Sequence, residues 1–397
     1  MNWRANLWIL CVSVLLTSAS YTMIMPFLPM YLLELGVTQE EVAMWSGAVF
    51  SASFFVGAVM APIWGKLADK SGKRLMALRA GFCLSAVYFL GSLVTGPWQL
   101  LGVRILQGFA NGFFPASLAI VSSSVPQEKL GFALGIIQAG QLVGGVLGPL
   151  GGGILSHEYS MRTSFVIAAV VLFLVTLAVA AFVREPARVA DKNAGSSILQ
   201  DIEASLHNPL LVEMLALTVV IQTAVMILQP VVTLYIAELQ GNMEGVVLTA
   251  GIIFSLGGFA GAISAPLWGN FGQRIGYLRV MVMAFAGAGF FNFLQYFPDS
   301  VMGFGALQFA FGLFIVGVNP SISAVIVRCT NASFRGRVFG LATTANQIGS
   351  MLGPLLGGVI AASFGIGSVF LLTGTLLMCI AALLARRHVY RKKPRVI

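Results

Sequence analysis

Arg104 is a cation inside a long apolar run, Leu101-Gly-Val-Arg104-Ile-Leu-Gln107-Gly108. A charged side chain at the centre of a bilayer costs about 2.5–3.5 kcal/mol on insertion scales, so an arginine there is a candidate for ion or substrate chemistry. The alternative is an arginine near the outer end of its helix, whose guanidinium extends to the membrane interface. The residues alone leave both interpretations open.

Carboxylates are scarce where a proton carrier would be useful. No Asp or Glu stands in the middle of an apolar run, although an acid that alternates between protonated and ionised forms is the usual means of coupling to protons. Glu34 and Glu238 lie at the outer ends of two runs, where charges at the mouth are the simpler explanation. The candidates for proton coupling are Arg104, Glu34 and Asp69.

A charged loop follows the second apolar run and reads Gly65-Lys-Leu-Ala-Asp69-Lys-Ser-Gly72-Lys73-Arg74. Its two glycines permit a tight turn. Asp69 stands among four cations, with which it can pair, or it can cap a helix. A basic loop that only follows the positive-inside rule is the alternative, but this spacing is more particular than that rule requires.

Glycines and one proline form another pattern, which reads Gly135, Gly144, Gly148-Pro149 and Gly152-Gly153. The spacings of four or nine residues predict that four of these glycines lie near one helical face: Gly135, Gly144, Gly148 and Gly152. Such a face would let a second helix approach closely. Pro149 removes a backbone hydrogen bond and allows a kink. The pattern recurs later in the chain at Gly340, Gly349, Gly353-Pro354 and Gly357-Gly358.

Membrane helices must position these groups. Of 397 residues, 58% are hydrophobic and 9% charged, whereas soluble domains are roughly a quarter charged. A bilayer span needs about 20 apolar residues. We predict an all-α protein of the cell membrane with twelve spans, at residues 7–32, 42–64, 75–95, 98–121, 130–156, 162–183, 210–236, 246–268, 279–297, 300–327, 337–362 and 367–386.

Basic residues predict the orientation. Of the 23 Lys and Arg, all but Arg104 and Arg162 fall on the side that holds both termini, and such residues concentrate in cytoplasmic loops. Both termini are therefore predicted to be cytoplasmic. The net charge of +9 then follows from topology, and the basic tail is predicted to contact anionic membrane lipid rather than nucleic acid.

The sequence repeats itself. Ala61-Pro-Ile-Trp-Gly65 reappears as Ala265-Pro-Leu-Trp-Gly269, an offset of 204 residues that becomes 205 after one insertion. We predict a six-helix half at 1–183, a cytoplasmic linker at 184–209, a second six-helix half at 210–386 and a tail at 387–397. Parallel halves of this kind hold a substrate between them at mid-membrane and rock about it.

The loop at 65–74 is similar to the signature loop of the major facilitator superfamily, G-x-L-a-D-x-x-G-r-[RK], although its second copy has Gln273 in place of the acid. The pattern from Gly135 to Gly153 resembles the antiporter motif of exporters in that superfamily. Arg104-x-x-Gln107-Gly108 resembles an R-x-x-q-G element linked to proton transfer in drug exporters, and Gln308 replaces the arginine in the second half. Nearly the whole chain resembles the twelve-helix drug:proton antiporters of bacteria.

This resemblance implies roles for the residues. The switch loop (Gly65, Asp69, Gly72, Lys73 and Arg74) would change contacts as the halves rock, with Asp69 helping to lock them closed on the cytoplasmic side. Arg104 would take part in proton transfer. The two glycine-proline helices would be interface and bending elements of the same motion.

The sequence gives little support for ATP binding, enzymatic catalysis or a metal site. No G-x-x-x-x-G-K-[ST] loop for ATP is present, and the three histidines fall in an outer loop, the linker and the tail. The four cysteines have no Cys-x-x-Cys spacing. We predict no enzymatic activity, no cofactor and no metal.

Polar and aromatic residues in the spans are candidate substrate contacts, although any one of them is more often a helix–helix hydrogen bond. They predict a largely uncharged, apolar and aromatic pocket. We expect a monomeric secondary transporter that exports hydrophobic or cationic drug-like small molecules in exchange for protons. An exporter of sugars or metabolites shares these motifs, and a membrane sensor or intramembrane enzyme would need a soluble domain or polar catalytic cluster. The candidates are Tyr31, Asn111, Phe113, Gln138, Gln141, Gln222, Gln229, Tyr235, Asn319 and Asn346.

Overall fold

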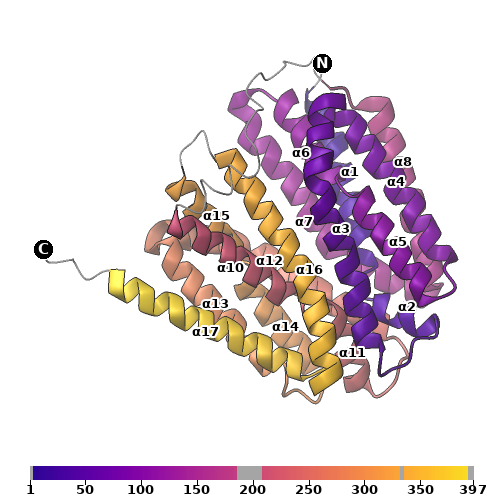
Figure 1. Cartoon of the computed structure of the whole chain (residues 1–397), viewed down its shortest axis with the longest axis vertical. Coiled ribbons are helices and arrows are strands. Elements are labelled where there is room, and N and C mark those ends of the chain that lie inside the picture. The colour runs from indigo at the N-terminus through magenta and orange to yellow at the C-terminus, as the bar shows by residue number, and fades with distance from the viewer. Residues whose placement is uncertain (1–2, 186–207, 331–334, 392–397) are drawn as a thin grey trace, which may run out of the picture.

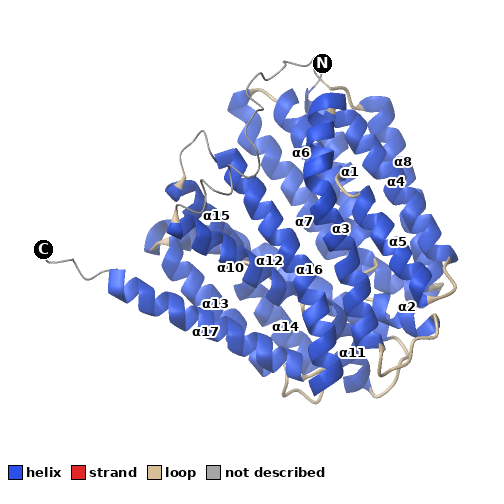
Figure 2. Cartoon of the chain, viewed as in Figure 1, coloured by secondary structure: helices blue, strands red, loops and turns tan. Residues whose placement is uncertain are grey.

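The computed structural model describes residues 3–185, 208–330 and 335–391, and within these ranges the protein is entirely helical, with no strand (Figure 2). Twelve helical segments are long and apolar enough to cross a membrane, which confirms the predicted number. The predicted linker falls mostly at 186–207 and the end of the tail at 392–397, outside the described residues.

The first half contains six spans, and the second half repeats them in the same order (Figure 1). The helices of the first half are α1 (Trp3–Met23), α2 (Leu28–Glu34), α3 (Val42–Ser71), α4 (Lys73–Leu93), α5 (Pro97–Ala110), α6 (Phe113–Ser124), α7 (Leu130–Glu158) and α8 (Met161–Phe182), with a 3₁₀ turn at Gln127–Lys129. Those of the second half are α10 (Pro209–Met226), α11 (Gln229–Gln240), α12 (Val246–Ile275), α13 (Tyr277–Leu294), α14 (Val301–Ile315), α15 (Val318–Cys329), α16 (Arg335–Phe364) and α17 (Ser368–Arg391).

Four spans are each broken into two helices, a feature that the predicted continuous spans missed. The breaks fall in the first, fourth, seventh and tenth spans, which occupy equivalent places in the repeat. Pro29 and Pro230 stand at the start of α2 and α11, where their missing N–H groups are tolerated. Gly112 separates α5 from α6 with a φ of 127°, a conformation that glycine adopts without strain.

The repeated residues pack in the same way in both halves. The Tyr31 hydroxyl donates to the Gly91 carbonyl at 3.0 Å and its ring contacts Phe165. Tyr235, its counterpart, donates to the Tyr296 carbonyl at 3.1 Å and contacts Phe370. The two halves are therefore built around the same internal contacts.

The halves meet mainly through two pairs of helices, α3 with α16 and α7 with α12, and α11 adds smaller contacts with α2 and α3. The Thr233 hydroxyl of α11 also donates to the Pro26 carbonyl at 2.7 Å. In Figure 1, α3 and α16 lie close together at the end away from the N-terminus and diverge toward the end that holds it. Side-chain contacts agree: those between α3 and α16 involve the first part of α3 and the last part of α16. The molecule is thus closed at the end away from the N-terminus.

Candidate transport site between the halves

Glycines let α7 approach α1 closely. A Cβ added at Gly144, Gly148 or Gly152 would overlap backbone atoms of α1, so these positions exclude any side chain. Gly349, Gly353 and Gly357 of α16 lie against the α10 backbone and the residue that follows it in the same manner. The predicted glycine contact faces therefore exist in both halves.

Gly135 does not belong to this face, which corrects our interpretation of the spacing. A Cβ at Gly135 would meet nothing within 4 Å, and the same holds for Gly340. Nine residues at about 100° each turn a helix by roughly two and a half turns, so Gly135 points away from the side that Gly144 occupies. Gly140, four residues before Gly144, takes the place next to α1.

The two interfaces between the halves are equivalent. Gly47 on α3 packs against the Pro354 carbonyl on α16, and Gly251 on α12 packs against the Pro149 carbonyl on α7. The Ser51 hydroxyl donates to the Met351 carbonyl at 2.6 Å. Ser255 donates to the Val146 carbonyl at the same distance. In this structure the glycine-proline helices α7 and α16 thus contact the opposite half.

At the opposite end of α3 and α12, the described glycines show no such contact. A Cβ at Gly65 on α3 or at Gly269 on α12 would meet nothing within 4 Å. The predicted orientation places this end in the cytoplasm, because it carries the basic loops. On the predicted orientation, the open end would face the cytoplasm.

Arg104 lies inside the first half rather than at its surface. The residue is only 2% exposed, and its guanidinium donates to the Gln107 side chain at 2.5 Å and stands over the Phe50 ring at 5.3 Å. Gln107 in turn donates to the Tyr88 hydroxyl at 3.2 Å. Among the described residues no carboxylate lies within ion-pair distance, and the Arg104 Nε has no partner. An arginine that reaches the interface is not what the structure shows.

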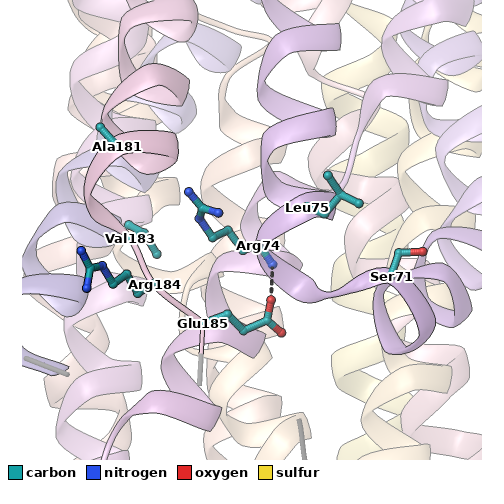
Figure 3. Close-up of a pocket in the computed structure, with 7 residues that line it drawn as sticks. All are labelled: Ser71, Arg74, Leu75, Ala181, Val183, Arg184 and Glu185. Carbon is teal, nitrogen blue, oxygen red and sulfur yellow. Dashed lines mark hydrogen bonds between the residues drawn. The ribbon is translucent and has the colours of Figure 1, made fainter. Parts of the chain in front are cut away.

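The switch loop is tied to the start of the linker (Figure 3). Gly72 ends α3 and precedes α4, and the Glu185 carboxylate accepts hydrogen bonds from the backbone N–H groups of Lys73 and Arg74 at 3.1 and 3.0 Å. The Arg74 side chain donates to the Ala180 carbonyl. Glu185 thus caps the N-terminus of α4, where a negative charge is favourable.

Gly65 and Asp69 of this loop belong to the last turns of α3. Asp69 lies within α3, but its side chain is outside the described residues. Gly65 is exposed. Our sequence interpretation missed Glu185, because an acid just after the sixth span is indistinguishable from ordinary linker composition.

Glu34 stands at the closed end, on α2. Burial raises the pKa of its carboxyl above the ordinary value, and the charge of nearby Arg162 opposes part of that rise. Arg162 itself donates to the Val94 carbonyl at 3.1 Å. Glu34 is therefore a titratable group at the mouth rather than at mid-membrane.

The predicted substrate contacts fall into two groups. Tyr31, Tyr235 and Phe113 are buried in the packing of their own halves. The amides are more accessible: Gln138, Gln141 and Asn319 are exposed, and Gln222, Gln229, Asn346 and Asn111 are half-buried. Gln222 joins Ser350 and Asn346 in hydrogen bonds of 3.0 and 3.4 Å between α10 and α16.

Two residues that the sequence interpretation missed lie near Asn111. The Arg79 guanidinium donates to the Phe109 and Asn111 carbonyls at 3.2 and 2.8 Å and lies 3.7 Å above the Trp64 ring. Gln347, on α16, reaches toward Gly57 in the other half. Arg79 is six residues into α4. In the sequence it cannot be distinguished from the basic residues of the predicted cytoplasmic end, so its contacts with Phe109 and Asn111 were not predicted.

Twelve spans in two parallel halves, closed at one end and open at the other, define a membrane carrier. The family profile of the Major Facilitator Superfamily matches residues 10–250 and 214–396. Two curated relatives are named multidrug resistance protein MdtG. The one from Salmonella arizonae is 35% identical, over 94% of this chain and 93% of the relative. The one from Rahnella sp. is 37% identical, over 95% of this chain and 92% of the relative. The chain belongs to the major facilitator superfamily and is a multi-pass transporter of the bacterial inner membrane.

Solved structures share this fold at low sequence identity. The nucleoside transporter NupG has a TM-score of 0.80 at 17% identity, covering 97% of this chain and 99% of that one. A bacterial homologue of the human lysosomal transporter Spinster, described as inward-facing and unoccupied, has a TM-score of 0.73 at 17% identity, covering 97% and 96%. These likenesses support the fold alone.

Proposed function

We propose that this transporter exports drug-like small molecules of predominantly apolar character, by alternating access, in exchange for protons. The observation that carries the proposal is the pair of equivalent glycine-proline interfaces, α3 with α16 and α7 with α12. Such interfaces let two rigid halves close at one end while they separate at the other. The relatives named as multidrug resistance proteins favour drugs over other cargo.

The side chains between the halves favour an uncharged or apolar substrate. The exposed polar side chains of α7 include the amides Gln138 and Gln141, and no carboxylate stands in the middle of a span. A sugar or metabolite exporter is the second candidate, supported by the amide cluster of Gln222, Asn346 and Ser350. Strongly anionic metabolites would call for several accessible cations.

Proton coupling is the part of the proposal that Arg104 supports. Its buried charge has no carboxylate partner within the part of the chain described, so its free energy depends on neighbouring hydrogen bonds. We propose that protonation elsewhere, with Glu34 and Asp69 as the candidate acids, changes these contacts. The switch loop would then re-form its contacts as the halves rock.

The first test uses inside-out vesicles with an acidic interior and a pH-sensitive dye. A fluorescent lipophilic drug is added to vesicles that carry the wild type, Arg104→Gln or Arg279→Gln. Arg104→Gln installs the residue that the second half has at this position, and Arg279→Gln, at an exposed arginine of α13, is the matched control. We expect drug entry to release protons with the wild type and the control, and to release none with Arg104→Gln.

The other outcomes each remove a defined part of the proposal. Drug movement that leaves the proton gradient intact with the wild type shows a uniporter or coupling to another ion. Unaltered coupling with Arg104→Gln removes Arg104 from the coupling path. If no drug moves at all while sugars do, the metabolite exporter replaces the drug exporter.

A further inference from the structure

Asn111 and Gln347 bring two side-chain amides from opposite halves to one point. Asn111 Nδ2 lies 3.6 Å, and Gln347 Nε2 3.3 Å, from the position that a Cβ on Gly57 would occupy. Both residues are half-buried. Within the described chain neither side-chain amide has a hydrogen-bond partner, so each keeps a donor and an acceptor available.

The point where they meet lies near the middle of two membrane-spanning helices. Gly57 lies near the centre of α3 (Val42–Ser71), and Gln347 lies near the centre of α16 (Arg335–Phe364). Nearer the open end of α3, Gly65 has no neighbour within 4 Å. The amides therefore border the place where the two halves begin to separate, which is where carriers of this design hold their substrates.

Arg79 adds a positive charge beside the same point. One of its guanidinium nitrogens donates to the Asn111 carbonyl, and the same nitrogen lies 3.2 Å from where a Cβ on Gly112 would stand. The guanidinium is held in place by Trp64 below it and by the carbonyls at the end of α5. Its Nε has no partner.

The equivalent place in the α7–α12 interface is apolar. There, Gly261 takes the position of Gly57 and is bordered by Val316 rather than by an amide. By the repeat offsets, Leu142 corresponds to Gln347 and Met283 to Arg79. Because the side chain beside Gly261 is apolar, packing at this glycine does not require an amide in the other interface.

We propose that Asn111, Gln347 and Arg79 form a subsite that binds the hydrogen-bond-accepting head group of an otherwise apolar substrate. The head group is a carboxylate or a neutral carbonyl, since all three residues can donate hydrogen bonds and Arg79 favours an acceptor that carries negative charge. A cationic ammonium group finds no counter-charge here in the described residues. The inference rests on the proposed export function and names its substrate class.

Equilibrium binding to the purified protein in detergent tests the subsite, read by energy transfer from tryptophan. Three probes share one pyrene body and differ in the head group: pyrenebutyrate, pyrenebutyramide and pyrenebutyl-trimethylammonium. The variant Asn111→Val with Gln347→Leu installs the residues found at the equivalent positions. Leu142→Gln, which places an amide in the apolar interface, is the control for packing.

The wild type is expected to bind the carboxylate and the amide more tightly than the ammonium. The double variant should reduce that preference about tenfold, because two hydrogen bonds are removed, and leave ammonium binding unchanged. Leu142→Gln should keep the wild-type preference. Equal loss for all three probes, no loss for any, or a wild type that binds neither acceptor probe overturns the proposal.

Arg79→Lys separates the two kinds of head group, since it keeps the charge but loses the planar fork. A loss confined to the carboxylate assigns an anionic head group, whereas equal losses for carboxylate and amide assign a neutral carbonyl. No loss for either removes Arg79 from the subsite and overturns that part of the proposal. Proteoliposomes that expel none of the probes would contradict the proposed export function while leaving the binding result intact.

Discussion

The α3–α16 and α7–α12 interfaces share their backbone packing and differ in their side chains near the middle of α3 and α12. Gly47 meets Pro354 as Gly251 meets Pro149, and two serines donate hydrogen bonds of equal length. Further in, Asn111 and Gln347 border one interface, whereas Val316 borders the other. The comparison indicates that the two halves share the contacts that close the molecule and differ at the positions of the proposed subsite.

The largest expected effect comes from filling the glycine contacts. Gly47→Leu and Gly251→Leu should each shift the balance of states away from this closed end by about 10- to 100-fold, because any Cβ overlaps a backbone carbonyl. Spin labels at Thr38 and Asn242, on a background without the four native cysteines, should report a longer distance, and transport should fall. If only one of the two variants changes the label distance, the two interfaces do not close together.

A smaller effect is expected from the serine hydrogen bonds. Ser51→Ala and Ser255→Ala each remove one bond of 2.6 Å between the halves, worth about 0.5–1.5 kcal/mol. Each should shift the same label distance distribution modestly and by a similar amount, and the double variant should show the sum. Unequal effects would place the closing energy in one interface.

The smallest effect on transport is expected from the buried tyrosines. Tyr31→Phe and Tyr235→Phe each delete a hydroxyl that donates to a backbone carbonyl within one half, so each should lower the unfolding free energy by about 1 kcal/mol and leave transport rates unchanged. Thermal unfolding and drug efflux measured on the same preparations check this. A specific loss of transport would instead return these tyrosines to the substrate site that their residue type suggested.

The spans, the two halves and the close glycine contacts were predictable, because a bilayer demands long apolar runs and close packing selects small residues. The breaks were not: Pro26 and Asn111-Gly112 are compatible with continuous helices, and only the packing shows the chain turning there. The meeting of Gln347 with Asn111 depends on the angle between the halves, which hydropathy does not encode. The contacts of Arg79 and Glu185 could not be predicted, because charged residues are common in the loops and the linker near them.

Trp64 and Trp268 occupy equivalent positions, and each donates its indole N–H to a carbonyl beside the break of a central span, at 3.0 and 2.7 Å. Of these two indoles, Trp64 lies against a cation, the guanidinium of Arg79, and within the described residues Trp268 does not. The two indoles are thus a matched optical pair, one sensing the polar subsite and the other an uncharged reference. In variants that keep one or both of these among the six tryptophans, emission would follow occupancy of the subsite without any attached label.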